Sequence, residues 1–218
     1  MTMDLEDVWR MREEDIYPSL FGPVSRGIFP LTQELFATRF GQTDVDPNWL
    51  FWGVIEFAPT PERPSWLYVT SGYSNPWDGP ADYDPQAESG FGAEFFLSVS
   101  EPGDWAIRTL QSMLAFDVLL ASDRFPGRQQ LALYDRIPLG GPINGKADCD
   151  VRNLVMVERE DGPQTFSLPS GEVFLVGFTG ITDAERDFAK NQGSEALIDQ
   201  LRAAGHHPVT DPNRRSIL

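Results

Sequence analysis

The sequence predicts an α+β fold in which helices cover a mixed β-sheet. Short runs of β-branched and aromatic residues, bounded by glycine, proline and aspartate, recur along the chain and are typical of strands. One long segment, 104–122, instead carries apolar residues at spacings of three and four, which indicates a helix. Helical patterns also precede and follow the strands, so a sheet with helices packed on it is the expected architecture.

The N-terminal third predicts two helices and a buried strand. Residues 4–14 have the charge and apolar spacing of a short amphipathic helix. Residues 32–40 are expected to form a second helix, which Thr32 caps and Gly41 ends. The nearly continuous apolar run at 50–57, LFWGVIEF, is typical of a strand buried on both faces.

Two further strands, at 66–70 and 93–99, flank a long polar segment rich in glycine, proline and aromatic residues. This loop, 71–92, exceeds about a dozen residues, and such connections are more often functional than plain linkers. The loop is therefore expected to present a surface. The helix at 104–122 follows; its second half is apolar around much of its circumference, so we expect the sheet to pack against it.

The C-terminal half predicts more strands and two final helices. Thr182 and Glu185 form a capping box for a helix to about Asn191, and Ser194 is expected to cap a last helix that ends before Gly205. The turn at Asp161, Gly162 and Pro163 should join the middle two of the four strands as a hairpin. The four strands are expected at 130–134, 153–158, 164–167 and 172–179.

Composition limits the classes of partner. With 218 residues, 41% of them hydrophobic, the chain fits one domain, residues 1–218. Its 17 Lys and Arg against 33 Asp and Glu give a net charge of -16, which disfavours nucleic acids and anionic membranes as partners. One cysteine excludes an intramolecular disulfide, and the N-terminus lacks the apolar run of a signal peptide. We therefore expect a cytoplasmic protein.

No pattern of metal ligands or nucleophiles stands out, so the sequence predicts no cofactor and no metal. His206 and His207 are adjacent beyond a helix end, which indicates a cap or turn role. Cys149 lies between acids that disfavour a thiolate. The segment 140–145 lacks the spacing of a phosphate-binding loop and is interpreted as flexible. Arg214 is expected in a surface ion pair of little energy.

The acids of the long loop and of the strand after it need separate interpretation. Asp78, Asp82, Asp84 and Glu88 do not follow the order of a calcium-binding loop, so solvated turn acids are the favoured interpretation. Glu94 lies within the strand at 93–99. Its carboxylate is expected either to pair with an arginine for structure or to serve in a site, and both alternatives stay open.

Aromatic residues in the same loop are typical of protein-interaction surfaces, although such loops also fold back and bury their aromatics. Both interpretations stay open for Tyr73, Trp77, Tyr83 and Phe91. The candidate partner-binding residues are Tyr73, Trp77, Asp78, Asp82, Tyr83, Asp84, Glu88, Phe91 and Glu94.

Three blocks of the chain, in the same order, resemble the suppressor of fused domain family. Together they span most of the sequence, although no single block is as specific as a zinc-ligand pattern. The first block is YVTSG (68–72), SNPW (74–77) and ESGFGAEF (88–95); the second is PSGEVFLVGFTGIT (169–182) with Glu185; the third is VTDP (209–212) with RSIL (215–218).

This resemblance implies a layered α/β/α sandwich and a non-catalytic protein-binding role. Animal members, it implies, sequester a Hedgehog-pathway transcription factor by strand addition of an extended peptide in a cleft. A second domain helps form that cleft, and 218 residues are expected to leave no room for one here.

Stand-alone bacterial relatives are thought to include immunity proteins that neutralise toxins. The predicted partner is therefore a basic toxin domain or an extended peptide, since an acidic surface steers basic proteins. The alternative is a carboxylate-dependent hydrolase that uses residues such as Glu94 and Glu88.

Overall fold

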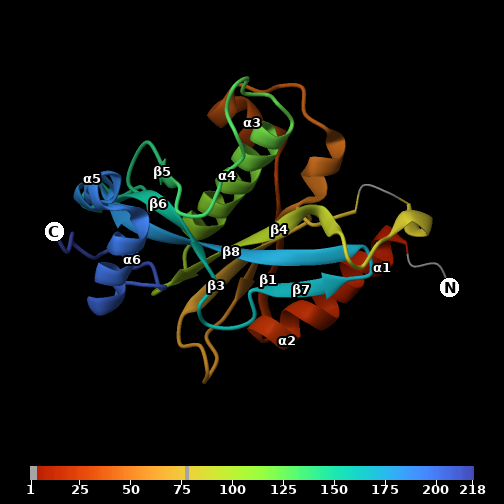
Figure 1. The fold of residues 1–218 in the computed structure, drawn as a ribbon, viewed down its shortest axis with the longest axis horizontal. Helices are drawn as coiled ribbons and strands as arrows, with labels where there is room; N and C mark the ends of the chain where they lie inside the picture. Colours follow the sequence, from red (N-terminus) through yellow and green to blue (C-terminus); the bar gives the residue numbers. More distant parts are fainter. Residues whose placement is uncertain (1–3, 77–78) are drawn as a thin grey trace.

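The computed structural model describes residues 4–76 and 79–218, and in it a mixed sheet lies between helices (Figure 1). The strand order is β1-β2-β3-β4-β8-β6-β5, and β7 pairs with β8 off this path. β4 and β8 are parallel, whereas the other paired strands are antiparallel. The strands are β1 (Val24–Pro30), β2 (Gly53–Phe57), β3 (Trp66–Ser71), β4 (Glu88–Val99), β5 (Arg136–Pro138), β6 (Val151–Glu158), β7 (Thr165–Leu168) and β8 (Gly171–Thr182).

Helices cover both faces of this sheet, which confirms the predicted layered α/β/α sandwich. No helix in the described part of the chain is long and apolar enough to span a bilayer. The helical elements are α1 (Leu5–Arg10), the π-helical η1 (Met11–Ile16), α2 (Tyr17–Phe21), α3 (Gln33–Phe40), the 3₁₀ turns η2 (Pro47–Phe51) and η3 (Pro80–Asp82), α4 (Asp104–Ala121), α5 (Asp183–Gln192) and α6 (Ser194–Ala203).

The central helix α4 packs on one face of the sheet, as its apolar periodicity predicts. Leu110 and Leu114 of α4 are fully buried, in one cluster with Tyr68 of β3, Leu97 of β4 and Phe178 of β8. Helix α3 lies beside α4 on this face (Figure 1). Its caps are those predicted: Thr32 accepts a hydrogen bond from Leu35 N, and Gly41 is left-handed.

The opposite face carries α1, η1 and α2 under β2, β3 and β7, and α5 with α6 under β6 and the end of β8 (Figure 1). Side chains alternate along the strands, so Ile55 and Phe57 of β2 point to this second face while Val54 packs with α4. Thr182 and Glu185 make the predicted capping box of α5. The sheet therefore has an apolar core on each face, between its strands and the helices that cover them.

Several predicted boundaries were wrong at the N-terminal side. The first helix does not stop at residue 14 but continues through η1 into α2, so it covers more of the sheet. Residues 50 and 51 belong to a 3₁₀ turn, Trp52 follows it in an extended conformation, and the strand begins at Gly53. β1 was not predicted, because its sequence VSRGIFP is largely exposed at the sheet edge and carries no regular apolar alternation.

Three predictions in the C-terminal half were also wrong. Residues 130–134 form no strand, and the short β5 comes directly after them. The hairpin expected around Gly162 does not form, because β7 pairs with β8 across the tighter connection at Pro169 and Ser170. Ser194 does not cap α6; it is the first residue of the helix, and its hydroxyl donates to Tyr134 O.

Candidate functional site

Glu94, in the middle of β4, is fully buried and is the centre of a polar cluster. Its Oε1 accepts hydrogen bonds from Gly72 N at 3.0 Å, Ser74 N at 3.0 Å and Ser74 Oγ at 2.7 Å. Its Oε2 accepts one from Thr70 Oγ1 at 2.5 Å. Carboxylates that are buried and accept this many hydrogen bonds hold the groups that donate them in place. Glu94 therefore shapes the chain from Thr70 to Ser74, which is where the long loop begins.

A buried arginine completes this cluster and decides between the two interpretations of Glu94. Arg12 of η1 is 1% exposed, and its Nη1 lies 3.6 Å from Glu94 Oε1. The same guanidinium donates to Ser71 Oγ at 3.0 Å, Ser74 Oγ at 3.0 Å and Asn75 Oδ1 at 2.8 Å. Glu94 is thus paired with an arginine for structure. The sequence does not distinguish Arg12 from its neighbour Arg10, since both lie on a charged helix.

Tyr73 lies in the core, and Phe91 is half-buried against it. Tyr73 is 1% exposed, and its ring stacks on Phe91 with ring centroids 4.5 Å apart. Its hydroxyl donates to Asp117 Oδ2 of α4 at 2.6 Å, and Leu131 N donates to Asp117 Oδ1 at 2.7 Å. Burial raises the pKa of Asp117, and burial together with the nearby Asp117 carboxylate raises the pKa of Tyr73. These two aromatics fold back as local core, the second of the two open interpretations.

The exposed part of the loop is the acidic segment, which we define as residues 79–88. Asp82, Asp84 and Glu88 are exposed there, and Tyr83 is half-buried against the apolar cluster that includes α2. Asp84 accepts a hydrogen bond from Gln86 N in a local turn, as solvated turn acids do. The remaining predicted residues of this loop, Trp77 and Asp78, lie outside the described residues.

Both ends of the loop are held firmly. Its first residues are bonded to Arg12 and Glu94, and after the acidic segment Ser89 Oγ donates to Ser74 O at 2.7 Å. Gly90 follows with φ +60°, and a Cβ there would lie 2.3 Å from Asn75 O. Only glycine permits this approach of the two backbone segments. The acidic segment is thus an exposed strip between two fixed anchors.

The site residues predicted from the sequence therefore divide into two groups. Tyr73 and Glu94 are buried and Phe91 is half-buried, and these three build the frame of the loop, whereas the acids of the acidic segment are exposed. The structure does not bring Glu94 and Glu88 together as a carboxylate pair, because one is buried among donors and the other is exposed. The sequence does contain one signal for Asp117: a lone carboxylate within the apolar run MLAFDVLLA.

Arg214 is a second buried arginine, which corrects its expected surface position. It is 5% exposed, and its Nη1 and Nη2 contact Glu185 Oε1 and Oε2 at 2.6 Å each. Burial raises the pKa of Glu185, but the hydrogen bonds from Arg214, Thr182 N and Ile217 N outweigh it, so the pKa is lowered overall. The pair fastens the C-terminal tail to the start of α5.

His207 is buried rather than placed at a helix terminus as a cation. Its Nδ1 lies 2.9 Å from Thr179 Oγ1 of β8, and its Nε2 lies 3.1 Å from Glu160 Oε1. Burial lowers its pKa by more than Glu160 raises it, which favours the neutral ring. Cys149 is buried too, with its thiol near Val151 O. Within 4–76 and 79–218, no group of three or more His, Cys, Asp or Glu side chains could hold a metal ion.

Comparison with known proteins gives a consistent result. The sequence model of the family described as Suppressor of fused protein (SUFU) matches residues 52–215. No curated protein matches the chain.

Three solved structures are similar in fold. The Sufu-Fu complex has a chain with a TM-score of 0.67 and 16% identity, covering 98% of this chain and 91% of that one. A SUFU homologue from Neisseria gonorrhoeae gives a TM-score of 0.62 and 19% identity, covering 96% and 97%. Drosophila Suppressor of Fused gives 0.58 and 18%, covering 75% of this chain and 42% of that one.

Proposed function

This chain belongs to the suppressor of fused family, and on that premise we propose that it is a non-catalytic protein-binding domain. A structurally similar chain was solved as the Sufu-Fu complex, so this fold occurs in a protein bound to a partner. The observation that carries the proposal is the acidic segment: exposed acids held between two anchors. A surface fixed before binding loses little conformational entropy when a partner docks.

The proposed partner is a basic protein domain, and the proposed role is that of an immunity protein that neutralises a cognate toxin in the cytosol. The net charge of -16 favours fast encounter with a basic partner. Asp82, Asp84 and Glu88 contribute negative charge on the loop, and the half-buried Tyr83 supplies an aromatic contact beside them. In this role Tyr73, Phe91 and Glu94 act indirectly, by holding the loop.

An extended peptide is the other form of partner that the fold suits. β5 is the edge strand next to β6, and its other side has no strand among the described residues. Edge strands accept further strands through their backbone groups. A hollow of about 340 Å³, lined partly by Phe40, Phe116 and Pro138, lies beside β5 and offers room for apolar side chains. Strand addition at β5 would supply the binding affinity, while the charge of the acidic segment would raise the association rate.

The hydrolase alternative receives no support from the carboxylates that motivated it. All the polar contacts of Glu94 are made with groups of its own chain, and burial leaves it no exposed surface for a substrate. Glu88 is exposed and separate from it.

The test begins with affinity capture from the native host, followed by association kinetics with the captured partner. Neutralising the acidic segment with Asp82→Asn, Asp84→Asn and Glu88→Gln should slow association by roughly tenfold at low salt and flatten its salt dependence. The dissociation rate should change little, because rim charges act mainly during the encounter.

A matched triple variant, Glu158→Gln, Glu195→Gln and Asp199→Asn, removes the same charge at the opposite end of the molecule, near α6 (Figure 1). At about 0.15 M salt it should leave the association rate within about twofold, because charges farther from the docking site than the Debye length of about 8 Å are then screened. Equal slowing by both variants would show that net charge alone matters and would sink the role of the acidic segment. The immunity role requires in addition that co-expression of this chain relieves the toxicity of the captured protein.

A further inference from the structure

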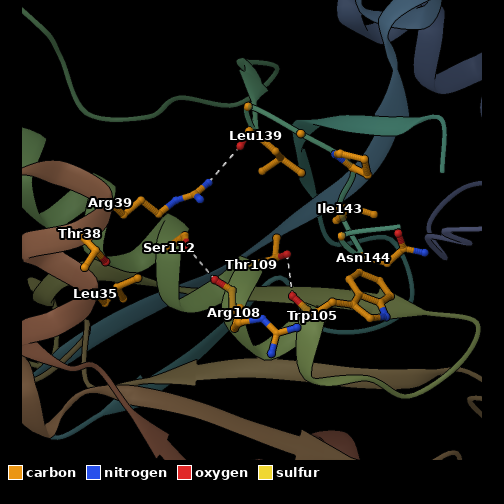
Figure 2. Close-up of a pocket in the computed structure, with 14 residues that line it drawn as sticks. Leu35, Thr38, Arg39, Trp105, Arg108, Thr109, Ser112, Leu139, Ile143 and Asn144 are labelled. Carbon is orange, nitrogen blue, oxygen red and sulfur yellow. Dashed lines mark hydrogen bonds between the residues drawn. The ribbon is translucent and has the colours of Figure 1, made fainter. Parts of the chain in front are cut away.

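A cavity among the described residues lies on the α3 and α4 side of the sheet, away from the acidic segment. Its volume is about 610 Å³, within the range of about 300–1,000 Å³ that is usual for ligand sites. Figure 2 shows its three walls: Arg39 and Leu35 from α3, Arg108 and Trp105 from α4, and the loop that carries Leu139, Ile143 and Asn144.

The charge of this cavity is opposite to that of the chain. Two arginines, Arg39 and Arg108, line it, and no aspartate or glutamate is among its lining residues, although the chain has 33 such acids and a net charge of -16. Cations without acidic partners that line one cavity of an acidic protein create a local field that attracts carboxylates.

Neither arginine is neutralised within the described part of the chain. Arg39 Nη2 donates to the backbone oxygen of Leu139 at 3.2 Å, and no carboxylate lies within ion-pair distance of Arg39 or Arg108 there. Other arginines do have such partners: Arg26 contacts Glu56 and Arg202 contacts Glu160. Both cavity arginines are exposed, so their guanidinium groups keep free donors for a ligand.

The rest of the wall is apolar or offers backbone groups. Leu35, Trp105, Leu139 and Ile143 supply the apolar part. The loop from 140 to 145 contains three glycines, and a Cβ added at any of them would meet nothing within 4 Å, so the backbone there is open to close approach. This sequence was interpreted as a flexible loop, whereas in the structure it forms one side of a cavity.

We propose that this cavity binds an extended segment of a partner protein in which carboxylate side chains alternate with apolar ones. The carboxylates would contact Arg39 and Arg108, and the apolar side chains would pack between Leu35, Trp105 and Ile143. The apolar wall favours a peptide over a small anion, which would leave that wall exposed. The proposal deepens the protein-binding function proposed above and rests on it: the cavity adjoins the hollow beside β5 and shares Arg39 with it, whereas Arg108 lines this cavity and not that hollow.

The test uses a fluorescein-labelled, amidated six-residue peptide of alternating glutamate and leucine, with an alternating lysine and leucine peptide for comparison. Fluorescence anisotropy is measured at about 0.15 M salt, where the Debye length of about 8 Å screens distant acids. The glutamate peptide should bind, and Arg39→Ala and Arg108→Ala should each weaken it by about threefold or more. Arg124→Ala is the matched control, because Arg124 is an exposed arginine beyond the end of α4 that does not line the cavity.

Charge reversal sharpens the result. The double variant Arg39→Glu, Arg108→Glu should lose the glutamate peptide and gain the lysine peptide, and thermal unfolding checks that it stays folded. Equal loss in Arg124→Ala, or no binding of the glutamate peptide to the unaltered chain, would overturn the proposal. The proposal would also be overturned if citrate displaced the glutamate peptide completely and bound with the same affinity as the peptide. The cavity would then be a site for small anions. Binding of a basic partner at the acidic segment is measured separately, so its failure cannot be confused with these results.

Discussion

At Glu94 and at Glu185 a carboxylate is fully buried with an arginine beside it. Taking such charges out of water costs several kcal/mol per ion, and the cost is offset only while the partner and the surrounding hydrogen bonds are present. Single substitutions at these two pairs should therefore be far more destabilising than substitutions of exposed ion pairs. The two pairs act at different places, one under the long loop and one at the C-terminal tail.

Glu94→Gln should destabilise the protein by about 3 kcal/mol, measured by urea unfolding at pH 7. The substitution removes the charge next to Arg12 and turns one acceptor into a donor, which faces either Gly72 N and Ser74 or the Thr70 hydroxyl. Glu88→Gln is the control; as an exposed residue it should stay within about 0.5 kcal/mol. Similar stability for the two variants would contradict the structural role of Glu94.

Two adjacent arginines allow a direct comparison at the tail. Arg214→Ala leaves the buried Glu185 without its cation and should cost about 3 kcal/mol or more at pH 7. Arg215→Ala removes an exposed pair with Asp150 and should cost less than about 1 kcal/mol. Urea unfolding of both variants measures the difference, and a larger loss in Arg215→Ala would refute the assignment.

The same pair predicts a pH dependence. The pKa of Glu185 is lowered from 4.5 in the folded chain, so its stabilisation is present above that value and is lost as the pH falls through the lowered one. The stability gap between the unaltered protein and Arg214→Ala should therefore narrow below about pH 4. A gap that stays constant from neutral to acidic pH would mean that Arg214 acts through packing alone.

At the scale of elements, α4 is the helix that covers the first face of the sheet and buries its apolar side chains. The helix is apolar on more than one side because it contacts the sheet below and α3 and the loop after β5 beside it. Leu114→Ala should cost about 2–5 kcal/mol, since the side chain is fully buried in the main cluster. Arg108→Ala, on the exposed side of α4, should change the stability by less than about 0.5 kcal/mol in the same urea titration. Unchanged stability in Leu114→Ala would disprove the packing.

The backbone at the start of β4 requires a glycine at position 90. Gly90→Ala combines a positive φ with a Cβ that would lie 2.3 Å from Asn75 O, so it should cost about 2 kcal/mol or more. Gly79→Ala in the acidic segment meets nothing within 4 Å at φ -72°, and it should be neutral or slightly stabilising. Thermal unfolding distinguishes them, and equal melting temperatures would show that the loop can relax around the new methyl group.

At the scale of the whole molecule, the net charge of -16 repels itself in the folded state. Raising the salt from about 0.01 M to about 0.15 M shortens the Debye length from about 30 Å to about 8 Å, which screens this repulsion. Stability should therefore rise over this range, although exposed ion pairs weaken at the same time. Thermal unfolding in NaCl and in KCl measures the effect. A fall in melting temperature, or a rise with one cation only, would count against general screening.

The sequence by itself determined the elements whose signals are local. The cap at Thr32, the capping box from Thr182 to Glu185 and the apolar spacing of α4 all involve residues three or four positions apart, so they are visible before folding. The α+β class followed from the order of such elements. β1 was not predicted from the sequence, because an exposed edge strand needs no alternation of apolar residues.

Tertiary structure alone decided which described residues of the long loop are buried and which are exposed. Tyr73 and Tyr83 look alike in sequence, yet one is in the core and the other half-exposed, because only the first reaches Asp117, 44 positions away. Arg12 donates a hydrogen bond to Ser71, 59 positions away, and β7 pairs with β8 rather than with β6. Such choices depend on which distant groups can bury and satisfy one another, and spacing along the chain carries no record of those contacts.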